Sequence, residues 1–458
     1  MPAGGSWKDY YVTEYFQLQE EGYDVSSMPC EAEVLPSHLD AVEVASEDSI
    51  WKEAYFNLIS LKKNGLRVNY KYNEPDDFNS IMALADPVPS FVPLSESEYE
   101  QRLKGAWFGR FAAVLLGKPL EMGFDRKQIR EYLESVNQYP LNDWVEPYSE
   151  KLDVRLREDC IPSSRGHVAY VQSDDDVHYT VSSLILAEEA GEDFTPWQAG
   201  QNLLDNITYN WVWTADKYLY HQLVNEDSES QFIKAVESGY AKANPWRESM
   251  CPQLKSDFWG YITPGEVQRG AHMIHRLGSL SATKNGLYGG MFMQGCVSAA
   301  LTASPTVDLI LDAGLSNIPR TSRIYEAVNN VRSWFASEKD WVKVCDRIYD
   351  SYGKWYFAGA INNVCFIVLS LLEGNLDYEK TICTAVMCGT DTDCNSGNAG
   401  SIVGAAIGFD NIPSKWTVPL NDTVKSAVAK FGEGTISNLV ERTQACRKVF
   451  NAYPPFCN

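Results

Sequence analysis

Two short acidic runs hold the residues of this chain that are best suited to chemistry. The first run, 173–176, reads Ser-Asp-Asp-Asp, and the second, 390–393, reads Thr-Asp-Thr-Asp. Each run comes directly before a segment with the apolar spacing of a helix. Carboxylate and hydroxyl oxygens are the ligands that hard cations such as Mg²⁺ prefer. We therefore expect a divalent-metal site at two helix starts, provided that the fold brings the two runs together.

A purely structural role is open for the first run. Ser173 could cap a helix while Asp176 reaches back to it, and acidic side chains in a first turn favour the helix dipole. Three consecutive aspartates repel one another, however, and capping does not need all three. In the second run, Asp391 and Asp393 enter an otherwise apolar helix, where a carboxylate is costly unless a cation or several donors accompany it. Taken together, the two runs favour a metal site.

The segments that must position these runs show the helical spacing of apolar residues, and no comparable series of alternating strands accompanies them. The expected helices, in chain order, cover 103–116, 177–190, 267–275, 290–303, 324–336, 358–372, 378–387 and 395–409. One or two further helices are expected within 422–452. The sequence thus predicts an all-α domain.

Small residues recur every four positions along two of these helices. They are Gly105, Gly109, Ala113 and Gly117 in the first helix, and Gly400, Gly404 and Gly408 in the second. Glycine inside a helix costs roughly 1 kcal/mol relative to alanine, so two such stripes indicate close backbone packing. If the two helices pack on each other, the end of the first lies near the acidic start of the second.

A proline-rich segment over 86–93 indicates a domain boundary. We expect a mostly helical N-terminal extension over 1–97, packed on the core, and a main domain over 98–458. No repeat of fixed period and no low-complexity tract is present.

Composition limits the class of protein. A hydrophobic content of 45% and an aromatic content of 12% indicate a globular chain. A net charge of −22 argues against nucleic acid or an anionic membrane as a partner. The eleven cysteines include no CxxC pair, which favours reduced thiols, and we find neither a leader segment nor an apolar run long enough for a bilayer. We expect a soluble, cytoplasmic protein, and the sequence leaves its oligomeric state open.

Over roughly 101–430 the chain resembles the ADP-ribosylglycohydrolase family. The first matching element is the glycine helix that ends in Gly117-Lys118-Pro119-Leu120-Glu121. Ser173-Asp174-Asp175 stands in the place of the family's Thr-Asp-Asp, and Gly389 to Asp393 matches its Asp-x-Asp element. The stretch 285–290 is similar to a glycine-rich segment found in part of the family.

This resemblance implies an all-α, compact orthogonal helical bundle with a dinuclear metal site between helices. It implies two Mg²⁺ ions, with Mn²⁺ or Ca²⁺ as alternatives, and hydrolysis of an N- or O-glycosidic bond to ADP-ribose. The implied catalytic residues are Glu121 and Asp175. The implied metal ligands are Ser173, Asp174, Asp175, Asp391 and Asp393. The residues implied to bind substrate are Asp176, Asn285, Tyr288, Gly289 and Gly290.

The chain departs from the family pattern at three positions. Cys394 stands where the family usually has a threonine ligand, and sulfur is a poor partner for Mg²⁺. Asp176 stands where threonine is common, and Val114 replaces an aspartate that many members carry. These changes suggest a different substrate more than lost chemistry.

The leading hypothesis is therefore a metal-dependent glycosidase acting on a small-molecule or ADP-ribosylated substrate. A small-molecule N-riboside hydrolase is the alternative within enzymes. A non-catalytic protein that binds ADP-ribose, or a structural protein of the crystallin kind, is the alternative outside them. Tyr179 and Trp211 could stack a ring of the substrate, although aromatic side chains at helical spacing more often fill a core.

Overall fold

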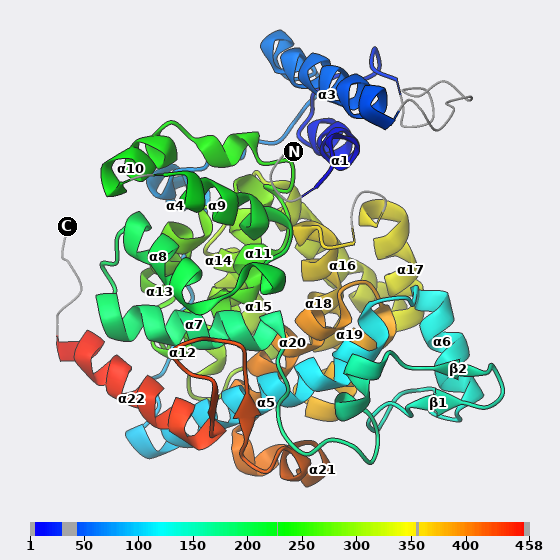
Figure 1. Ribbon diagram of the computed structural model, residues 1–458. Coiled ribbons are helices and arrows are strands. Elements are labelled where there is room, and N and C mark those ends of the chain that lie inside the picture. Colours follow the sequence, from blue (N-terminus) through cyan, green and yellow to red (C-terminus); the bar gives the residue numbers. More distant parts are fainter. Residues whose placement is uncertain (1–4, 30–43, 227, 354–356, 453–458) are drawn as a thin grey trace.

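The computed structural model describes residues 5–29, 44–226, 228–353 and 357–452. Across these residues the fold is all-α, as expected (Figure 1). The only strands in this part of the chain form two antiparallel hairpins of two residues a strand. One pairs β1 (Tyr148–Ser149) with β2 (Val154–Arg155), and the other pairs β3 (Val424–Lys425) with β4 (Glu433–Gly434).

Among the described residues, three α-helices precede the main body, which begins with a long helix at Glu96. They are α1 (Trp7–Glu20), α3 (Val44–Ser60) and α4 (Phe78–Leu84). The first half of the main body contains α5 (Glu96–Glu121), α6 (Arg126–Ser135), α7 (Asp175–Ala190), α8 (Pro196–Asn206), α9 (Thr214–Asn225), α10 (Glu229–Glu237), α11 (Cys251–Leu254), α12 (Ser256–Tyr261) and α13 (Val267–Gly278).

The second half continues with α14 (Lys284–Ala300), α15 (Val307–Leu315), α16 (Arg323–Glu338), α17 (Trp341–Tyr352), α18 (Ala360–Gly374), α19 (Tyr378–Cys388), α20 (Thr392–Ile407), α21 (Ser414–Thr417) and α22 (Ile436–Ala452). Short 3-10 turns, η1 to η6, lie at Leu61–Asn64, Glu158–Ser163, Tyr209–Trp211, Tyr240–Ala243, Phe409–Asn411 and Val418–Leu420.

Helices α5 and α20 form the centre of the core and pack backbone against backbone. A Cβ atom on Gly105 would lie 2.3 Å from the carbonyl oxygen of Gly404, and one on Gly109 would lie 2.5 Å from that of Gly400. No side chain larger than hydrogen fits at these distances without movement of the backbone. The predicted contact between the two glycine stripes is therefore confirmed.

One or two helices were expected within 422–452, and one, α22, is present, preceded by a short hairpin that was not expected. Residues 424–434 form the β3–β4 hairpin, and only α22 follows. Strands of two residues leave no period in the sequence, so nothing distinguished this hairpin from a helix start.

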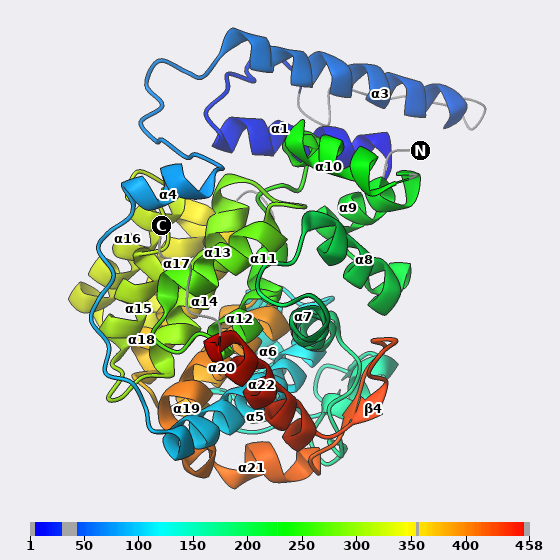
Figure 2. The same ribbon diagram turned by 90° about the vertical axis from the view of Figure 1, so that its left-hand side faces the viewer.

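Helices α1 and α3 lie side by side above the main body (Figures 1 and 2). Their buried aromatic side chains form a separate core cluster that includes Trp246 of the main body, whose ring meets Tyr10 edge-on at 5.2 Å. Buried Arg247 also pairs with Glu14 and Glu21, each at 2.7 Å. Apolar packing and buried charge thus hold the first helices on the main body, while the boundary at 97/98 stays a prediction.

In the part of the chain that the structure describes, no helix is both long and apolar enough to cross a membrane. The cysteines of the same residues are buried free thiols.

Candidate metal centre and substrate pocket

Three helix termini meet at the floor of a cavity of about 570 Å³. Helix α5 contributes its last residue, Glu121. The start of α7 contributes 174–176, and the start of α20 contributes Asp391 and Asp393. The two acidic runs, more than two hundred positions apart in sequence, therefore line one cavity.

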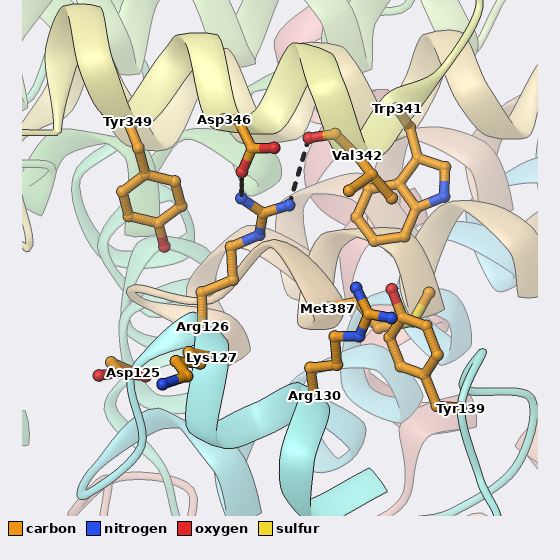
Figure 3. Close-up of a pocket in the computed structure, with 10 residues that line it drawn as sticks. All are labelled: Asp125, Arg126, Lys127, Arg130, Tyr139, Trp341, Val342, Asp346, Tyr349 and Met387. Carbon is orange, nitrogen blue, oxygen red and sulfur yellow. Dashed lines mark hydrogen bonds and ion pairs between the residues drawn. The ribbon is translucent and has the colours of Figure 1, made fainter. Parts of the chain in front are cut away.

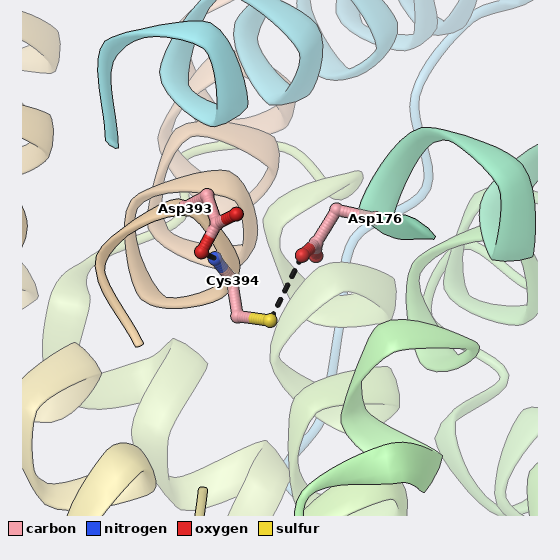
Figure 4. A group of neighbouring side chains, drawn as sticks. All are labelled: Asp176, Asp393 and Cys394. Atoms are coloured by element: carbon pink, nitrogen blue, oxygen red, sulfur yellow. Dashed lines mark hydrogen bonds between the residues drawn. The ribbon is translucent and has the colours of Figure 1, made fainter. Parts of the chain in front are cut away.

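The carboxylate oxygens of this floor lie within reach of a shared cation. One ligand oxygen from each of Glu121, Asp391 and Asp393 lies within 4.8 Å of the other two. The same holds for the three aspartates of the first run, and for Asp176, Asp393 and the sulfur of Cys394 (Figure 4). We refer to Glu121, Asp174, Asp175, Asp176, Asp391 and Asp393 as the acidic cluster.

Hydrogen bonds between helices fix the start of α20 against α5. The Thr392 hydroxyl donates to the carbonyl oxygen of Gly117 at 2.8 Å, and the Ser396 hydroxyl donates to that of Ala113 at 2.7 Å. A Cβ atom on Gly117 would lie 2.3 Å from the Thr392 carbonyl oxygen. The last turn of α5 and the first turn of α20 therefore keep Glu121 beside the second run.

The loop before α20 contains two residues with positive φ angles, a conformation that residues other than glycine rarely adopt. Gly389 and Thr390 have φ values of +80° and +63°. The Thr390 hydroxyl donates to Asn363 Oδ1 at 3.0 Å, and the Tyr349 hydroxyl donates to the Cys388 carbonyl oxygen at 2.8 Å. Because Asp391 follows directly, these bonds set where its carboxylate lies.

A second cavity, of about 450 Å³, lies on the other side of this loop, between α6 and α17 (Figure 3). Arg126 reaches across it from α6 to pair with Asp346, and also donates to the Val342 carbonyl oxygen at 3.2 Å. A Cβ atom on Gly389 would lie 3.1 Å from Arg126 Cβ and 3.0 Å from the Tyr349 hydroxyl. The side of this loop that faces α6 and α17 is thus tightly packed, which limits the movement of Asp391.

Asp174, and not Ser173, caps α7. Its Oδ1 accepts from the backbone N–H of Asp176 at 3.1 Å. The Ser173 hydroxyl instead donates to the carbonyl oxygen of Lys425 at 3.2 Å, and Ser173 does not line the cavity. The expectation that Ser173 caps the helix is therefore wrong, and its role as a metal ligand stays a prediction.

Two buried cations that sequence reasoning missed enter the acidic cluster from α5. Lys118 Nζ lies 2.8 Å from Asp174 Oδ2. Arg110, fully buried, pairs with Asp176 and with Asp257, each at 2.9 Å. Both could have been suspected, because a charged residue inside an apolar, glycine-striped helix requires a buried partner.

Burial and mutual repulsion disturb the protonation of the remaining carboxyls. Burial, reinforced by Asp393 and Asp391, raises the pKa of Glu121 to about 12. Burial and the charge of Asp174 raise the pKa of Asp393 to about 6, and burial with Asp393 raises that of Asp391 well above its ordinary value. Among the described residues, no lysine or arginine forms an ion pair with these three carboxyls or with Asp175. Uncompensated oxygen donors of this kind fit a hard divalent cation.

Cys394 acts as a hydrogen-bond donor in this centre. Its Sγ lies 2.8 Å from Asp176 Oδ2 (Figure 4). Burial and the charge of Asp176 raise the pKa of the thiol well above its usual range. The thiol is thus a donor to one aspartate of the cluster, and its sulfur is a poor ligand for Mg²⁺.

Aromatic and cationic side chains form the walls of the cavity. Trp213 is 51% exposed, and Lys217 Nζ lies 5.0 Å from its ring. Trp211 meets the His178 ring edge-on at 4.7 Å, and Arg157 stands beside the floor. Trp211 was among the expected ring contacts, whereas Trp213, Lys217 and Arg157 lie in loops or on helix surfaces without a distinctive pattern.

Asp176 lines the cavity, but the other four residues expected to bind substrate do not. Asn285 donates to Glu74 and Glu248, and the Tyr288 hydroxyl donates to the carbonyl oxygen of Pro75. The two glycines of this group pack against Gln253 and Pro252. Asn285 and Tyr288 thus contact the chain before α4, and the two glycines contact α11. A substrate role stays a prediction for Asn285, Tyr288, Gly289 and Gly290.

The fold and the site define an all-α protein with acidic clusters that could hold a metal ion. Residues 95–448 match the model of the ADP-ribosylglycohydrolase family, and the chain belongs to this family. Membership of a glycohydrolase family supports a hydrolase role. A solved structure titled "ADP-ribosylglycohydrolase-related protein complex" is similar at 14% identity and a TM-score of 0.45, over 77% of this chain and 99% of that one. Comparison with curated proteins gave no match.

Proposed function

We propose that this protein is a metal-dependent hydrolase that cleaves the glycosidic bond of an ADP-ribosyl or related ribosyl compound. One observation carries the proposal. Glu121, Asp391 and Asp393, from the ends of two helices packed through glycine, offer oxygens within 4.8 Å of one another at the floor of a cavity. This set of carboxylate oxygens suits a hard divalent cation, for which we propose Mg²⁺.

Asp391 and Asp393 would hold the cation, with Asp175 and Glu121 beside it. When bound, the cation supplies positive charge that offsets the carboxylates and polarises the hydroxyl groups of a ribose. The two aspartates suit this role because the hydrogen bonds of the α20 start fix their backbone while neither has a cationic partner among the described residues.

Glu121 would move the proton of the attacking water at the anomeric carbon. Its carboxyl ends α5 and lines the cavity, half-buried and next to the two aspartates. Burial and the neighbouring carboxylates raise its pKa, so the carboxyl holds a proton when no cation is bound. The positive charge of a bound cation would favour the carboxylate form that a general base requires. Asp175, at the first position of α7, would orient the ribose from the opposite side.

The walls of the cavity suit an ADP-ribosyl group better than a bare nucleoside. A volume of about 570 Å³ is in the range of small-molecule sites. The rings of Trp211 and Trp213 offer stacking surfaces for adenine, and Arg157 and Lys217 offer positive charge for a diphosphate. Arg157 also pairs with Asp159 at 3.0 Å, whereas Lys217 forms no ion pair among the described residues, so a nucleoside would leave Lys217 without an anionic partner.

Turnover tests this proposal directly. The purified protein is incubated with peptides that carry ADP-ribose on arginine or on serine, and separately with free nucleosides, in Mg²⁺ or in excess chelator. The proposal expects release of ADP-ribose in Mg²⁺ only. Release of ribose from nucleosides, with none from the peptides, would favour the N-riboside hydrolase instead. No turnover of any of these compounds would leave the non-catalytic alternative.

A further inference from the structure

We propose that the metal centre of this chain takes one divalent cation and not two, because Lys118 and Arg110 already occupy the ligands of the second. The inference rests on the metal dependence proposed above. It concerns which carboxylate oxygens of the acidic cluster are free to bind a cation.

Both oxygens of Asp174 are engaged. Oδ1 accepts from the backbone N–H of Asp176 as the cap of α7, and Oδ2 lies 2.8 Å from Lys118 Nζ. The ammonium group also donates to the Ser173 carbonyl oxygen at 2.8 Å. Its side chain is only 7% exposed, so it lies within the cluster and does not extend into solvent. A cation bound to Asp174 would lie beside the Lys118 ammonium group, which repels it.

Both oxygens of Asp176 are engaged as well. Oδ1 accepts from Arg110 Nη2 at 2.9 Å, and Oδ2 accepts from the Cys394 thiol at 2.8 Å. Arg110 cannot turn away, because its other terminal nitrogen pairs with Asp257 at 2.9 Å and its side chain is fully buried. The side of the cluster formed by Asp174, Asp176 and Cys394 is thus closed by donors.

The opposite side remains open to a cation. Glu121 and Asp175 accept no hydrogen bond among the described residues. Asp393 Oδ1 accepts from the backbone N–H of Cys394 at 3.0 Å, and the Asp393 side chain is also hydrogen-bonded to Asp391, within the same open side of the cluster. These oxygens, with those of Asp391, are enough for one hexacoordinate ion that keeps some water. Two ions about 3.5–4 Å apart would need further carboxylates and would place the second beside the Lys118 ammonium, which repels it.

Metal stoichiometry tests the proposal without reference to activity. Metal-free protein is titrated with Mn²⁺, and bound Mn²⁺ is counted by equilibrium dialysis and elemental analysis. Its electron paramagnetic resonance spectrum separates an isolated ion from a coupled pair. We expect one ion per chain with the spectrum of isolated Mn²⁺. Two ions with a coupled spectrum would overturn the proposal. No bound ion would contradict the metal dependence itself, and with it the proposed function.

Two double variants test whether Lys118 and Cys394 prevent the binding of a second cation. Lys118→Ala combined with Cys394→Thr releases Asp174 and restores an oxygen at position 394, so this protein should bind a second Mn²⁺ with a coupled spectrum. Lys127→Ala combined with Cys394→Thr is the matched control, because Lys127 is exposed on α6, and it should bind one. One ion in the first double variant would refute the role of Lys118.

If the double variant does not fold, two single substitutions test the same assignment of ligands. Asparagine can still cap α7, so Asp174→Asn should change the Mn²⁺ affinity less than about 10-fold. Asp391→Asn should lower it at least about 100-fold, since even partners of metal ligands contribute roughly 10–100-fold. Equal losses in the two variants would overturn the assignment.

Discussion

The Thr392 hydroxyl donates a 2.8 Å hydrogen bond to the carbonyl oxygen of Gly117. This bond joins the last turn of α5 to the first turn of α20, and each turn carries part of the acidic cluster. The chain can approach so closely only because position 117 has no side chain. The glycine stripes therefore serve the site as well as the core.

Gly117→Ala should weaken both the fold and the metal site. The new Cβ would lie 2.3 Å from the Thr392 carbonyl oxygen, and overpacking of this kind costs about 1–3 kcal/mol. Chemical denaturation and Mn²⁺ titration measure the two effects. Gly404→Ala, whose Cβ would lie 2.2 Å from the Gly105 carbonyl oxygen at the far end of the same contact, should lower stability alone. Normal metal affinity in Gly117→Ala would show that this contact does not position the site.

Arg110→Met should destabilise the protein by about 3–5 kcal/mol, because it leaves Asp176 and Asp257 buried without a cation. Urea denaturation measures the loss. Arg332→Met is the control, since its partners are exposed and such pairs contribute about 1 kcal/mol or less. Equal losses in the two variants would contradict the view that Arg110 neutralises the cluster.

Asp391→Asn should leave a folded protein that no longer gains stability from Mg²⁺. In chelator its midpoint of thermal unfolding should match or exceed that of the native chain, because one of several repelling carboxylates is gone. A thermal scan with and without Mg²⁺ measures both effects. Asp350→Asn, an exposed change on α17, should keep the stabilisation by Mg²⁺. If Mg²⁺ still stabilises Asp391→Asn, Asp391 is not a ligand of the cation.

The free energy of unfolding of the metal-free protein should fall as the pH rises from about 5 to 8. Burial and neighbouring charges raise the pKa of Asp393 to about 6 and that of Glu121 to about 12. The folded state therefore holds protons that the unfolded chain has already released, and this contribution is lost as the pH rises through the folded pKa. Denaturation at several pH values, in chelator and in Mg²⁺, measures it. Saturation with Mg²⁺ should reduce or reverse this decrease in the free energy of unfolding. If the dependence on pH is the same in Mg²⁺ and in chelator, no cation binds in the cluster.

Much of the architecture could be predicted from the sequence. The four-residue spacing of glycine indicated the closely packed face of each of α5 and α20. If those faces met, the end of α5 would lie near the second acidic run, and the structure shows this contact. The acidic runs were expected to lie together, and they line one cavity, while their role as metal ligands stays a prediction. The packing of the two helices could be inferred because close backbone contact depends on residue type and local spacing.

Other features depended on contacts that no local pattern contains. A buried charge at Lys118 or Arg110 demands a partner, but only the fold selects Asp174 for one and Asp176 for the other. The stretch 285–290 resembled a substrate loop, yet α14 buries it against residues before α4. The β3–β4 hairpin is too short to show a period.

The metal-dependent role of Glu121 is tested by the release of ADP-ribose from an ADP-ribosylated peptide, measured for the native chain and for Glu121→Gln. We expect release by the native chain in Mg²⁺, none in chelator, and a rate at least about 100-fold lower in Glu121→Gln, in line with the loss of a general base. The variant should still bind Mn²⁺. Release that persists in chelator would contradict the metal dependence, and equal rates for the two proteins would contradict the role of Glu121.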